Sequence, residues 1–369
     1  MQHLLCFSHL SWNFVYQRPQ HLLTRFATQY QVFYFEEPKI AERDEYVVNL
    51  QDGVCIVQLL IKDPSSSEIQ VQNLIQNLIS EYNIESYISW YYTPMALQFT
   101  DQLAPEIIVY DSMDELSAFR FAPPHLIELE NELFRKADVV FTGGYSLFQA
   151  KKNRHQNIHA MPSSIDKHHF EQARVPQSDP YDQESISHPR LGFFGVIDER
   201  FDIDLLRNVA HLRPGWQFVI IGPVVKIDKS DLPQGHNIHY LGPKSYTELP
   251  TYIAHWDIAL ILFALNESTE FISPTKTPEY LAAGKPVIST AIKDVIHPYG
   301  NAGLVKIVNG SESFIEEAEK IFRDKDRDHW LRKVDHFLEN DSWDHTFSMM
   351  STLINNVKFK NTQKQINHV

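Results

Sequence analysis

Short apolar runs alternate with amphipathic stretches along almost the whole chain, and this alternation restricts the fold more than any other feature. In the first half, the apolar run Ile107–Asp111 is typical of a buried strand, whereas Ile69–Ile79 carries apolar residues at helical spacing. The same alternation resumes after residue 190. Strands that alternate with helices are typical of parallel sheets covered by helices on both faces. We therefore predict an α/β chain of two doubly wound, Rossmann-like domains.

The strands that we expect in the first half are His3–Ser8, Gln31–Phe35, Val54–Leu60, Ser86–Tyr92, Ile107–Asp111, Asp138–Thr142 and Ile158–Pro162. A local hairpin is expected over 45–60, through Asp52-Gly53. The strands expected in the second half are Arg190–Phe194, Trp216–Gly222, Ile238–Leu241, Ile258–Leu262, Val287–Ser289 and Leu304–Val308.

A chain of 369 residues is long enough for two domains, each with its own core. Residues 171–189 contain three prolines and little apolar periodicity, which predicts a linker. This gives an N-terminal domain over 1–170, a C-terminal domain over 190–342 and a final helical segment over 343–369. Residues after Lys358 are polar, and we expect them to be frayed.

The charge distribution argues against nucleic-acid binding. The net charge is −14, from 33 basic and 47 acidic residues, and neither half carries a basic stripe. Two cysteines and the lack of a signal peptide or a run of about 20 apolar residues predict a cytoplasmic protein of a reducing compartment. The one dense basic patch contains Lys151, Lys152 and Arg154. It is either a solvated helix end or a peripheral contact with anionic lipid.

The segment Ser268–Thr290 carries the most chemical information. Thr277 is expected to cap a helix that starts at Pro278, and Gly284 is expected to end it. Free backbone N–H groups and the Lys276 ammonium would then form an anion site beside the preceding loop. Glu279, kept ionised by the helix dipole, could accept hydrogen bonds from vicinal hydroxyls such as those of a ribose. A capped surface helix is the alternative.

Gly195 ends the first strand of the second domain and would let a phosphate approach the backbone; a tight strand-to-helix turn is the alternative. Arg200 follows in the same loop, either as a phosphate ligand or as an exposed charge. Asp202 and Asp204 spell D-x-D, but both fall at a predicted helix start, where Asp is a favoured cap. No His or Cys cluster has metal-ligand spacing, so we expect no metal site.

In the first domain, Asp111 ends a predicted buried strand, at the sheet edge where α/β proteins bind their ligands. A carboxylate there could act as general base for an acceptor hydroxyl, or orient the acceptor instead. Asp114 is either an acceptor contact or a first-turn helix acid. In the loop after the first strand and the segment that follows it, the side chains that could face an acceptor are those of His9, Trp12, Arg18 and His21; ordinary packing is the alternative for the tryptophan and for His21.

Several segments together resemble one enzyme family. SPTKTPEYLAAGKPVIST resembles the nucleotide-sugar signature of GT-B glycosyltransferases, close to glycosyltransferase family 4 and to its bacterial envelope-polysaccharide branch related to teichuronic acid transferases. The segments that agree with this branch in order and spacing are HLSWNFVYQRPQHLLTRFA, FYFEEP, VYDSMDELSAF, ADVVFTGG, MPSSID, LGFFGVIDERFDIDLL, IIGP and SWDHT.

The resemblance implies a GT-B fold, with two domains facing each other across a cleft and a final helix that crosses back to the first. It implies metal-independent transfer of a sugar from a nucleotide sugar, with UDP favoured, to a saccharide or lipid-linked saccharide acceptor, without a resident cofactor. A nucleotide-sugar epimerase or a non-catalytic binding protein of this fold is the alternative.

The resemblance also implies roles for single residues. Glu279 would bind the ribose, Thr275 and Lys276 the diphosphate, and Ser273 would lie near the donor sugar. Gly195, Arg200 and Gly222, the glycine of IIGP, would belong to the donor site as well. The family usually has a second Glu eight positions before the ribose ligand, but Phe271 stands there in this chain, and Glu270 is the nearest carboxylate.

Overall fold

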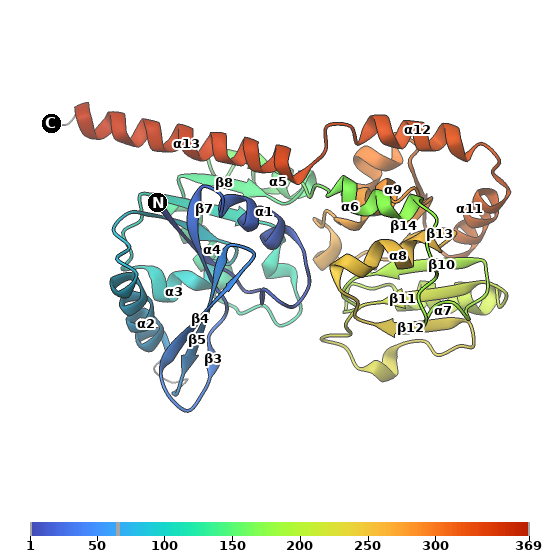
Figure 1. Ribbon diagram of the computed structural model, residues 1–369, viewed down its shortest axis with the longest axis horizontal. Coiled ribbons are helices and arrows are strands. Elements are labelled where there is room, and N and C mark those ends of the chain that lie inside the picture. Colours follow the sequence, from blue (N-terminus) through green and yellow to red (C-terminus); the bar gives the residue numbers. More distant parts are fainter. Residues whose placement is uncertain (1, 64–66, 368–369) are drawn as a thin grey trace. The chain divides into compact units, whose positions relative to one another are not determined.

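The computed structural model describes residues 2–63 and 67–367 and separates into two compact units. The first contains residues 1–162 and 343–369, and the second contains residues 163–342. Each unit is a sheet with helices on both faces (Figure 1), so the expectation of two Rossmann-like α/β domains is confirmed.

The sheet of the first unit has the order β3-β5-β2-β1-β6-β7-β8-β9, in which neighbouring strands are parallel, and β4 adds to β5 in the antiparallel direction. The turn between β4 and β5 contains Asp52 and Gly53, both with positive φ, as the expected hairpin requires. The strands are β1 (Gln2–Phe7), β2 (Tyr30–Phe35), β3 (Lys39–Ile40), β4 (Glu45–Gln51), β5 (Val54–Ile61), β6 (Tyr87–Tyr91), β7 (Ile107–Ser112), β8 (Val139–Thr142) and β9 (Ile158–Ala160).

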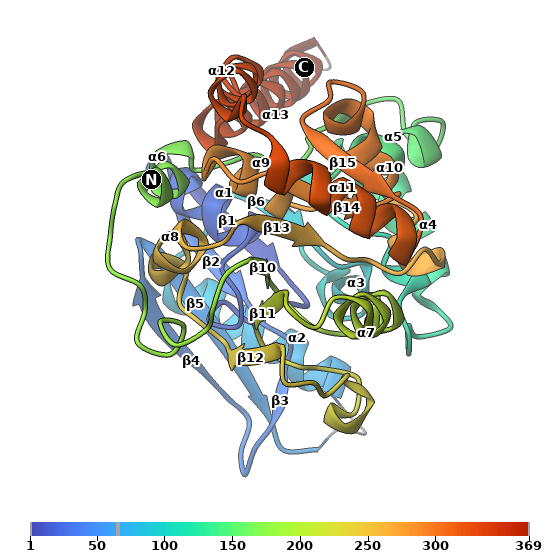
Figure 2. The same ribbon diagram turned by 90° about the vertical axis from the view of Figure 1, so that its right-hand side faces the viewer.

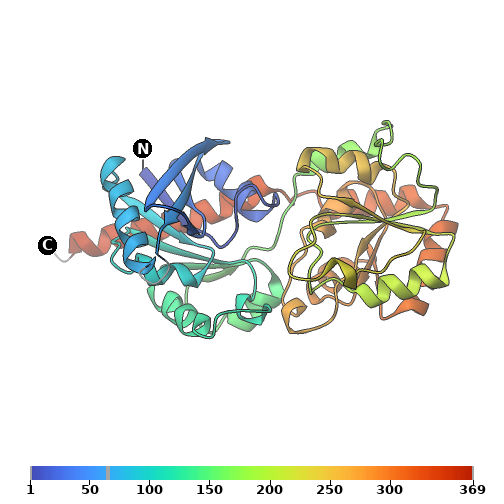
Figure 3. The same cartoon turned by 90° about the horizontal axis from the view of Figure 1, so that it is seen from below.

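Two apolar clusters hold the helices of this unit on the two faces of its sheet. One joins the strands to α1 (Arg18–Phe26) and α13 (Trp343–Asn367), and the other joins them to α2 (Ser67–Glu81), α3 (Leu97–Thr100) and α4 (Leu126–Lys136). Helix α5 (Tyr145–Lys151) precedes β9. Figure 3 shows α13, in red, running along the first unit. The helix continues to Asn367, beyond the point at which we expected fraying, and residues 368–369 lie outside the described part.

The sheet of the second unit is parallel, in the order β12-β11-β10-β13-β14-β15. The chain moves outward from β10 in one direction and then restarts at β13 in the other (Figure 2), which makes the β10/β13 boundary the switch point of the sheet. The strands are β10 (Arg190–Phe194), β11 (Gln217–Ile221), β12 (Ile238–Gly242), β13 (Ile258–Ile261), β14 (Val287–Thr290) and β15 (Val305–Val308).

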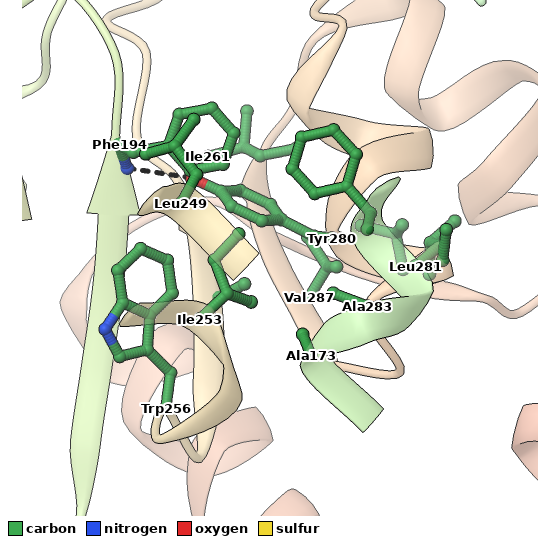
Figure 4. Close-up of a cluster of buried hydrophobic side chains, with 14 of the residues drawn as sticks. Ala173, Phe194, Leu249, Ile253, Trp256, Ile261, Tyr280, Leu281, Ala283 and Val287 are labelled. Carbon is green, nitrogen blue, oxygen red and sulfur yellow. Dashed lines mark hydrogen bonds between the residues drawn. The ribbon is translucent and has the colours of Figure 1, made fainter. Parts of the chain in front are cut away.

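Two apolar clusters also organise the second unit. Helices α7 (Ile203–Leu212) and α11 (Ser311–Arg323) pack on one face of its sheet. The other face is covered by α6 (Lys167–Glu171), α8 (Leu249–Ala254), α9 (Lys276–Ala282) and α12 (Arg327–Phe337). Figure 4 shows the centre of this second cluster, where Trp256 and Tyr280 lie against β10. The short α10 (Lys293–Val295) follows β14.

The predicted linker over 171–189 is wrong, because these residues are built into the second unit. Ala173 and Ile186 belong to its apolar core. Gln183 is buried and accepts a hydrogen bond of 2.9 Å from the indole N–H of Trp256, while its own amide donates to the carbonyl of Tyr252. Prolines and polar residues therefore mark an irregular but packed segment, whose polar groups are satisfied by distant parts of the chain.

Within residues 2–63 and 67–367, no helix combines the length and the apolar character that a membrane crossing requires.

Candidate functional site

The candidate site lies at the carboxyl end of β10, at the switch point of the second unit. Gly195 follows β10 with φ +138°, and a Cβ placed on it would lie 2.2 Å from Cε of Lys276. The Lys276 side chain therefore crosses directly over the glycine. Gly222, at the end of β11, has φ +142°, and a Cβ there would lie 1.8 Å from the carbonyl oxygen of Gly195. Only glycine allows these segments to approach so closely.

Two aromatic rings flank the ammonium group of Lys276. Its Nζ lies 5.6 Å from the ring centroid of Phe193, in β10, and 5.6 Å from that of Phe263, which follows β13. These contacts attract a cation and keep it near the switch point. The lysine thus carries a positive charge to the sheet edge where parallel α/β folds bind ligands.

Glu279 lies one helical turn after Lys276 and is buried. Loss of water raises the pKa of its carboxyl to about 8, and the nearby Lys276 charge opposes that rise. Among the described residues, none donates a hydrogen bond to this carboxyl, so a ligand with hydroxyl groups would supply what it lacks. Burial thus works against the ionised form that we expected the helix dipole to favour.

Tyr280 fixes the helix that carries these two residues. Its hydroxyl accepts a hydrogen bond of 2.9 Å from the backbone N–H of Phe194, as Figure 4 shows, and its ring packs edge-on against the Phe194 ring. This contact ties α9 to the end of β10. The sequence analysis did not single out Tyr280, Phe193 or Phe263. Two signals could have indicated them: Phe193 and Phe263 lie at or just after the ends of apolar strands, and Tyr280 lies in the predicted helix that carries Glu279.

The start of α9 differs from the expected one. The helix begins at Lys276, with Thr275 at the position before it and no capping hydrogen bond from the Thr275 side chain. Thr277 lies inside the helix and is buried, with no hydrogen-bond partner for its hydroxyl among the described residues. The predicted Thr277 cap is therefore wrong. Thr275 and Ser273 are both partly exposed in the loop that leads into Lys276.

The remaining donor-site candidates already have partners. The guanidinium of Arg200 binds both carboxylate oxygens of the buried Asp198, at 2.7 to 3.1 Å, so much of its charge is compensated inside the loop. Glu270 forms an exposed ion pair of 2.7 Å with Lys293. Asp202 accepts a hydrogen bond of 2.9 Å from the backbone N–H of Leu205, which confirms that it caps α7. Within the described residues, no group of three His, Cys, Asp or Glu side chains could hold a metal ion.

In the first unit, Asp111 is completely buried and binds the equally buried Arg18. The guanidinium donates to both carboxylate oxygens at 2.8 to 3.1 Å, and its remaining Nη1 donates to the carbonyl of Met161 at 2.8 Å. This geometry argues against Asp111 as a general base that receives a proton from an acceptor. It indicates instead that Arg18 joins α1 to β7 and to the end of β9.

Two more of the acceptor-side candidates pack in the core. Trp12 is buried edge-on against Tyr34. His21 is buried and stacks on Trp343, with ring centroids 4.7 Å apart. Trp12 and His21 therefore pack in the core, which is the alternative to an acceptor contact that the sequence left open. His9 and Asp114 are partly exposed and lie in the segments that follow β1 and β7, at the carboxyl edge of this sheet.

The basic patch at the end of α5 is not a free cationic surface. Lys151 is buried and forms ion pairs with Glu130 and, at 3.0 Å, with Glu115. Arg154 pairs with Glu130 at 2.6 Å and covers the ring of Phe134. A lipid contact through Lys151, Lys152 and Arg154 is therefore not supported, since two of the three charges are used within the unit.

The chain contains two parallel α/β units, and the second carries a lysine and a buried carboxyl near its switch point. Residues 188–324, which lie in the second unit, match the family described as glycosyl transferases group 1. In sequence, the chain is 27% identical over 164 residues to TuaH of Bacillus subtilis (strain 168), whose name assigns it to teichuronic acid biosynthesis as a glycosyltransferase. That alignment covers 39% of this chain and 41% of TuaH.

Solved structures agree on the fold. A sucrose-phosphate synthase of Thermosynechococcus elongatus superposes with a TM-score of 0.72 at 13% identity, over 97% of this chain and 99% of that one. Anabaena HepE in complex with UDP and glucose gives 0.72 at 12% identity, over 96% and 100%. WaaG, a glycosyltransferase of lipopolysaccharide biosynthesis, gives 0.67 at 14%, over 95% and 99%. The expected GT-B fold is confirmed.

Proposed function

We propose that this protein is a glycosyltransferase that moves a hexosyl group from a nucleotide diphosphate sugar to a hydroxyl acceptor. The observation that carries the proposal is the position of Lys276, folded over Gly195 at the switch point, with the buried Glu279 one turn further along α9. A cation followed by an unsatisfied carboxyl matches a ligand with a diphosphate next to a ribose. In the reaction, the bond from the sugar to the diphosphate breaks, the acceptor oxygen bonds to the sugar and the acceptor proton is released.

Each residue has a distinct task in this proposal. Lys276 binds the diphosphate and stabilises the charge that grows on it as the sugar leaves; two unit charges about 4 Å apart interact by about 4 kcal/mol at an effective dielectric constant of 20. Glu279 accepts hydrogen bonds from the ribose hydroxyls. Gly195 and Gly222 allow the Lys276 side chain and the ends of β10 and β11 to pack closely, which holds the ammonium at the donor site. Ser273 and Thr275 line the approach to Lys276.

UDP is the nucleotide that we favour. The names of HepE with UDP and glucose, and of the trehalose-6-phosphate protein of E. coli bound with UDP-2-fluoro glucose, support this choice. The names of TuaH and WaaG support an acceptor that belongs to a bacterial envelope polysaccharide, free or lipid-linked. Because nucleotide sugars are cytoplasmic metabolites, we place the reaction in the cytoplasm. We propose no resident cofactor, and no metal in the transfer step, because Lys276 supplies the charge that the diphosphate needs.

A screen of melting temperature against UDP, GDP, ADP and dTDP sugars tests the donor. Ligands that bind the native state raise its apparent stability, by about 2.7 kcal/mol at a hundredfold excess over Kd. We expect UDP sugars to raise the Tm of the wild type, with or without EDTA, and to leave that of the Glu279→Ala variant unchanged. Equal shifts in both proteins would overturn the assignment of the site.

A non-catalytic nucleotide-binding protein is the second candidate. The pairing of Asp111 with Arg18 favours it, because this buried carboxylate is engaged and is not left to take a proton from an acceptor. Release of UDP from a UDP sugar in the presence of a panel of saccharide acceptors separates the two functions. A transferase releases UDP only when an acceptor is present, a binding protein releases none, and an epimerase converts the donor alone.

A further inference from the structure

A cavity lies in the second unit at the amino-terminal ends of β13, β14 and β15, opposite to the carboxyl edge that carries Lys276. Its volume is about 180 Å³. Asp257, Pro286 and Leu304, the residues that immediately precede these three strands, form its floor, and the end of α11 and the start of α12 form its walls. The nucleotide site proposed above uses none of these residues.

One wall of this cavity is apolar and partly aromatic. Phe322, at the end of α11, and Trp330, in α12, line it together with Leu304. The indole N–H of Trp330 donates a hydrogen bond of 3.2 Å to the carbonyl of Leu304, which fixes the ring over the strand ends. The Phe322 ring is edge-on to Trp216. Both rings are therefore already fixed by contacts within the protein. A flat apolar ligand that packs on them would immobilise few additional side chains, so the loss of conformational entropy on binding is small.

Charged side chains of both signs also line the cavity. Arg327 and Lys306 line the cavity, and Lys285 is buried close to Arg327. The pKa of Lys285 is lowered to about 8, first by burial and then by the charge of Arg327. Lys285 donates to the carbonyls of Ala254 and Trp256, so no carboxylate in the described residues neutralises it directly.

The acidic groups near the cavity are partly engaged by other groups, and Glu317 pairs with Lys306 at 3.7 Å. Asp257 and Asp324 both line it. One oxygen of Asp257 already binds the His188 ring at 2.7 Å and the backbone N–H of Arg190 at 2.7 Å. Asp324 accepts from the backbone N–H of Asp326. The lining thus holds two cations and two carboxylates. Both carboxylates have other partners, and Arg327 forms no ion pair within 4 Å among the described residues.

Arg327 is the group best placed to bind an anion. The residue as a whole is exposed. The pKa of its guanidinium is nevertheless lowered, mainly because neighbouring atoms displace water from around this group. The one hydrogen bond that it makes within the described residues runs from Nη2 to the carbonyl of Gly284, at 3.3 Å. A guanidinium presents five N–H donors, so most of them are available to a carboxylate or sulfonate.

We propose that this cavity is a second ligand site, which binds a small amphiphilic anion: one flat apolar ring carrying a single acidic group. The ring lies against Trp330 and Phe322, and the acidic group binds Arg327 and Lys306. The site is independent of the proposed glycosyl transfer, because it lies at the other end of the strands.

Fluorine NMR with 4-(trifluoromethyl)benzoate tests the site on the full-length protein. We expect saturable binding of one probe per chain, and binding about tenfold weaker to the Arg327→Gln variant, because a charge-assisted pair is lost. Arg332→Gln, an exposed arginine on the same helix that does not line the cavity, is the matched control and should bind like the wild type. The neutral probe 4-(trifluoromethyl)benzamide should bind about tenfold more weakly than the benzoate.

A second variant and a competition experiment with UDP test the same site. Lys306→Gln changes an exposed side chain, so it should fold normally and weaken the benzoate severalfold. Saturating UDP should leave the probe bound. Equal affinity for benzoate and benzamide, equal affinity of Arg327→Gln and the wild type, or displacement of the probe by UDP would each overturn the proposal.

Discussion

At the scale of single residues, the buried carboxyl of Glu279 is the most informative group. Its raised pKa means that folding favours the neutral acid. The stability that the neutral form contributes is complete at pH values below the ordinary carboxyl range, and it is lost as the pH rises through about 8. A ribose that offers two hydroxyl donors prefers the carboxylate, so binding and folding favour opposite protonation states.

This conflict predicts a pH dependence of nucleotide affinity. Between pH 7 and 9 the ionised fraction of a group with a pKa of about 8 increases about tenfold. The affinity for UDP, measured by calorimetry, should therefore increase by up to about tenfold over this range. Glu279→Gln should bind more weakly and show a flat profile. The same slope in both proteins would mean that another group titrates.

Arg18 and Asp111 give a prediction about stability. Removing one partner of a buried ion pair leaves an uncompensated charge and costs about 3 to 5 kcal/mol. Arg18→Met should therefore lower the free energy of unfolding of the first unit by that amount, measured in urea. Arg25→Met is the control on the same helix, because the pair of Arg25 with Asp344 is exposed and should cost less than about 1 kcal/mol.

The double variant Arg18→Met/Asp111→Leu should recover part of the loss, because it removes the stranded carboxylate together with its partner. If Arg18→Met were as mild as Arg25→Met, the pair would not have the structural role that we give it.

At the scale of elements, the close approach of β10 and α9 forms the candidate site. Alanine at position 195 would have to adopt φ +138° and would put its Cβ where Cε of Lys276 lies. The flexible lysine would give way, so the fold should persist while the ammonium leaves its place. We predict that Gly195→Ala weakens UDP binding at least tenfold in calorimetry, and that it also lowers the Tm because alanine is strained at this φ.

Gly215→Ala is the matched control, since a Cβ there meets no atom within 4 Å and the residue has no positive φ. It should bind UDP like the wild type. Normal UDP binding by Gly195→Ala would show that the position of Lys276 over this glycine does not matter for the ligand.

The sequence predicts helices and strands well where one face of the element, or the whole element, is buried. The bounds of β10 agree with the expected Arg190–Phe194, and Ile69–Ile79 lies inside α2. The errors have a common physical cause. Thr277 resembles a cap but is drawn into the helix, and residues 171–189 resemble a linker but pack on the second unit. Both outcomes depend on tertiary contacts that local propensity does not contain.

At the scale of the whole molecule, side chains far apart in sequence decide which charged residues are available to ligands. Arg18 and Asp111 are 93 positions apart, and the buried Lys151 is paired with Glu130 and Glu115 on other elements. No local pattern reveals such pairs. Lys276 and Glu279 could be found because they lie within one turn of a helix, in a segment with a strong family resemblance.

The most direct test of the central claim is the affinity of the full chain for UDP, measured by titration calorimetry, when Lys276 is removed. Lys229→Ala, an exposed lysine in the second unit, controls for the loss of one positive charge. We predict that Lys276→Ala weakens UDP binding by about a hundredfold, consistent with the loss of an ion pair worth a few kcal/mol, while Lys229→Ala binds like the wild type. Equal affinities of the two variants would contradict the claim that Lys276 holds the diphosphate.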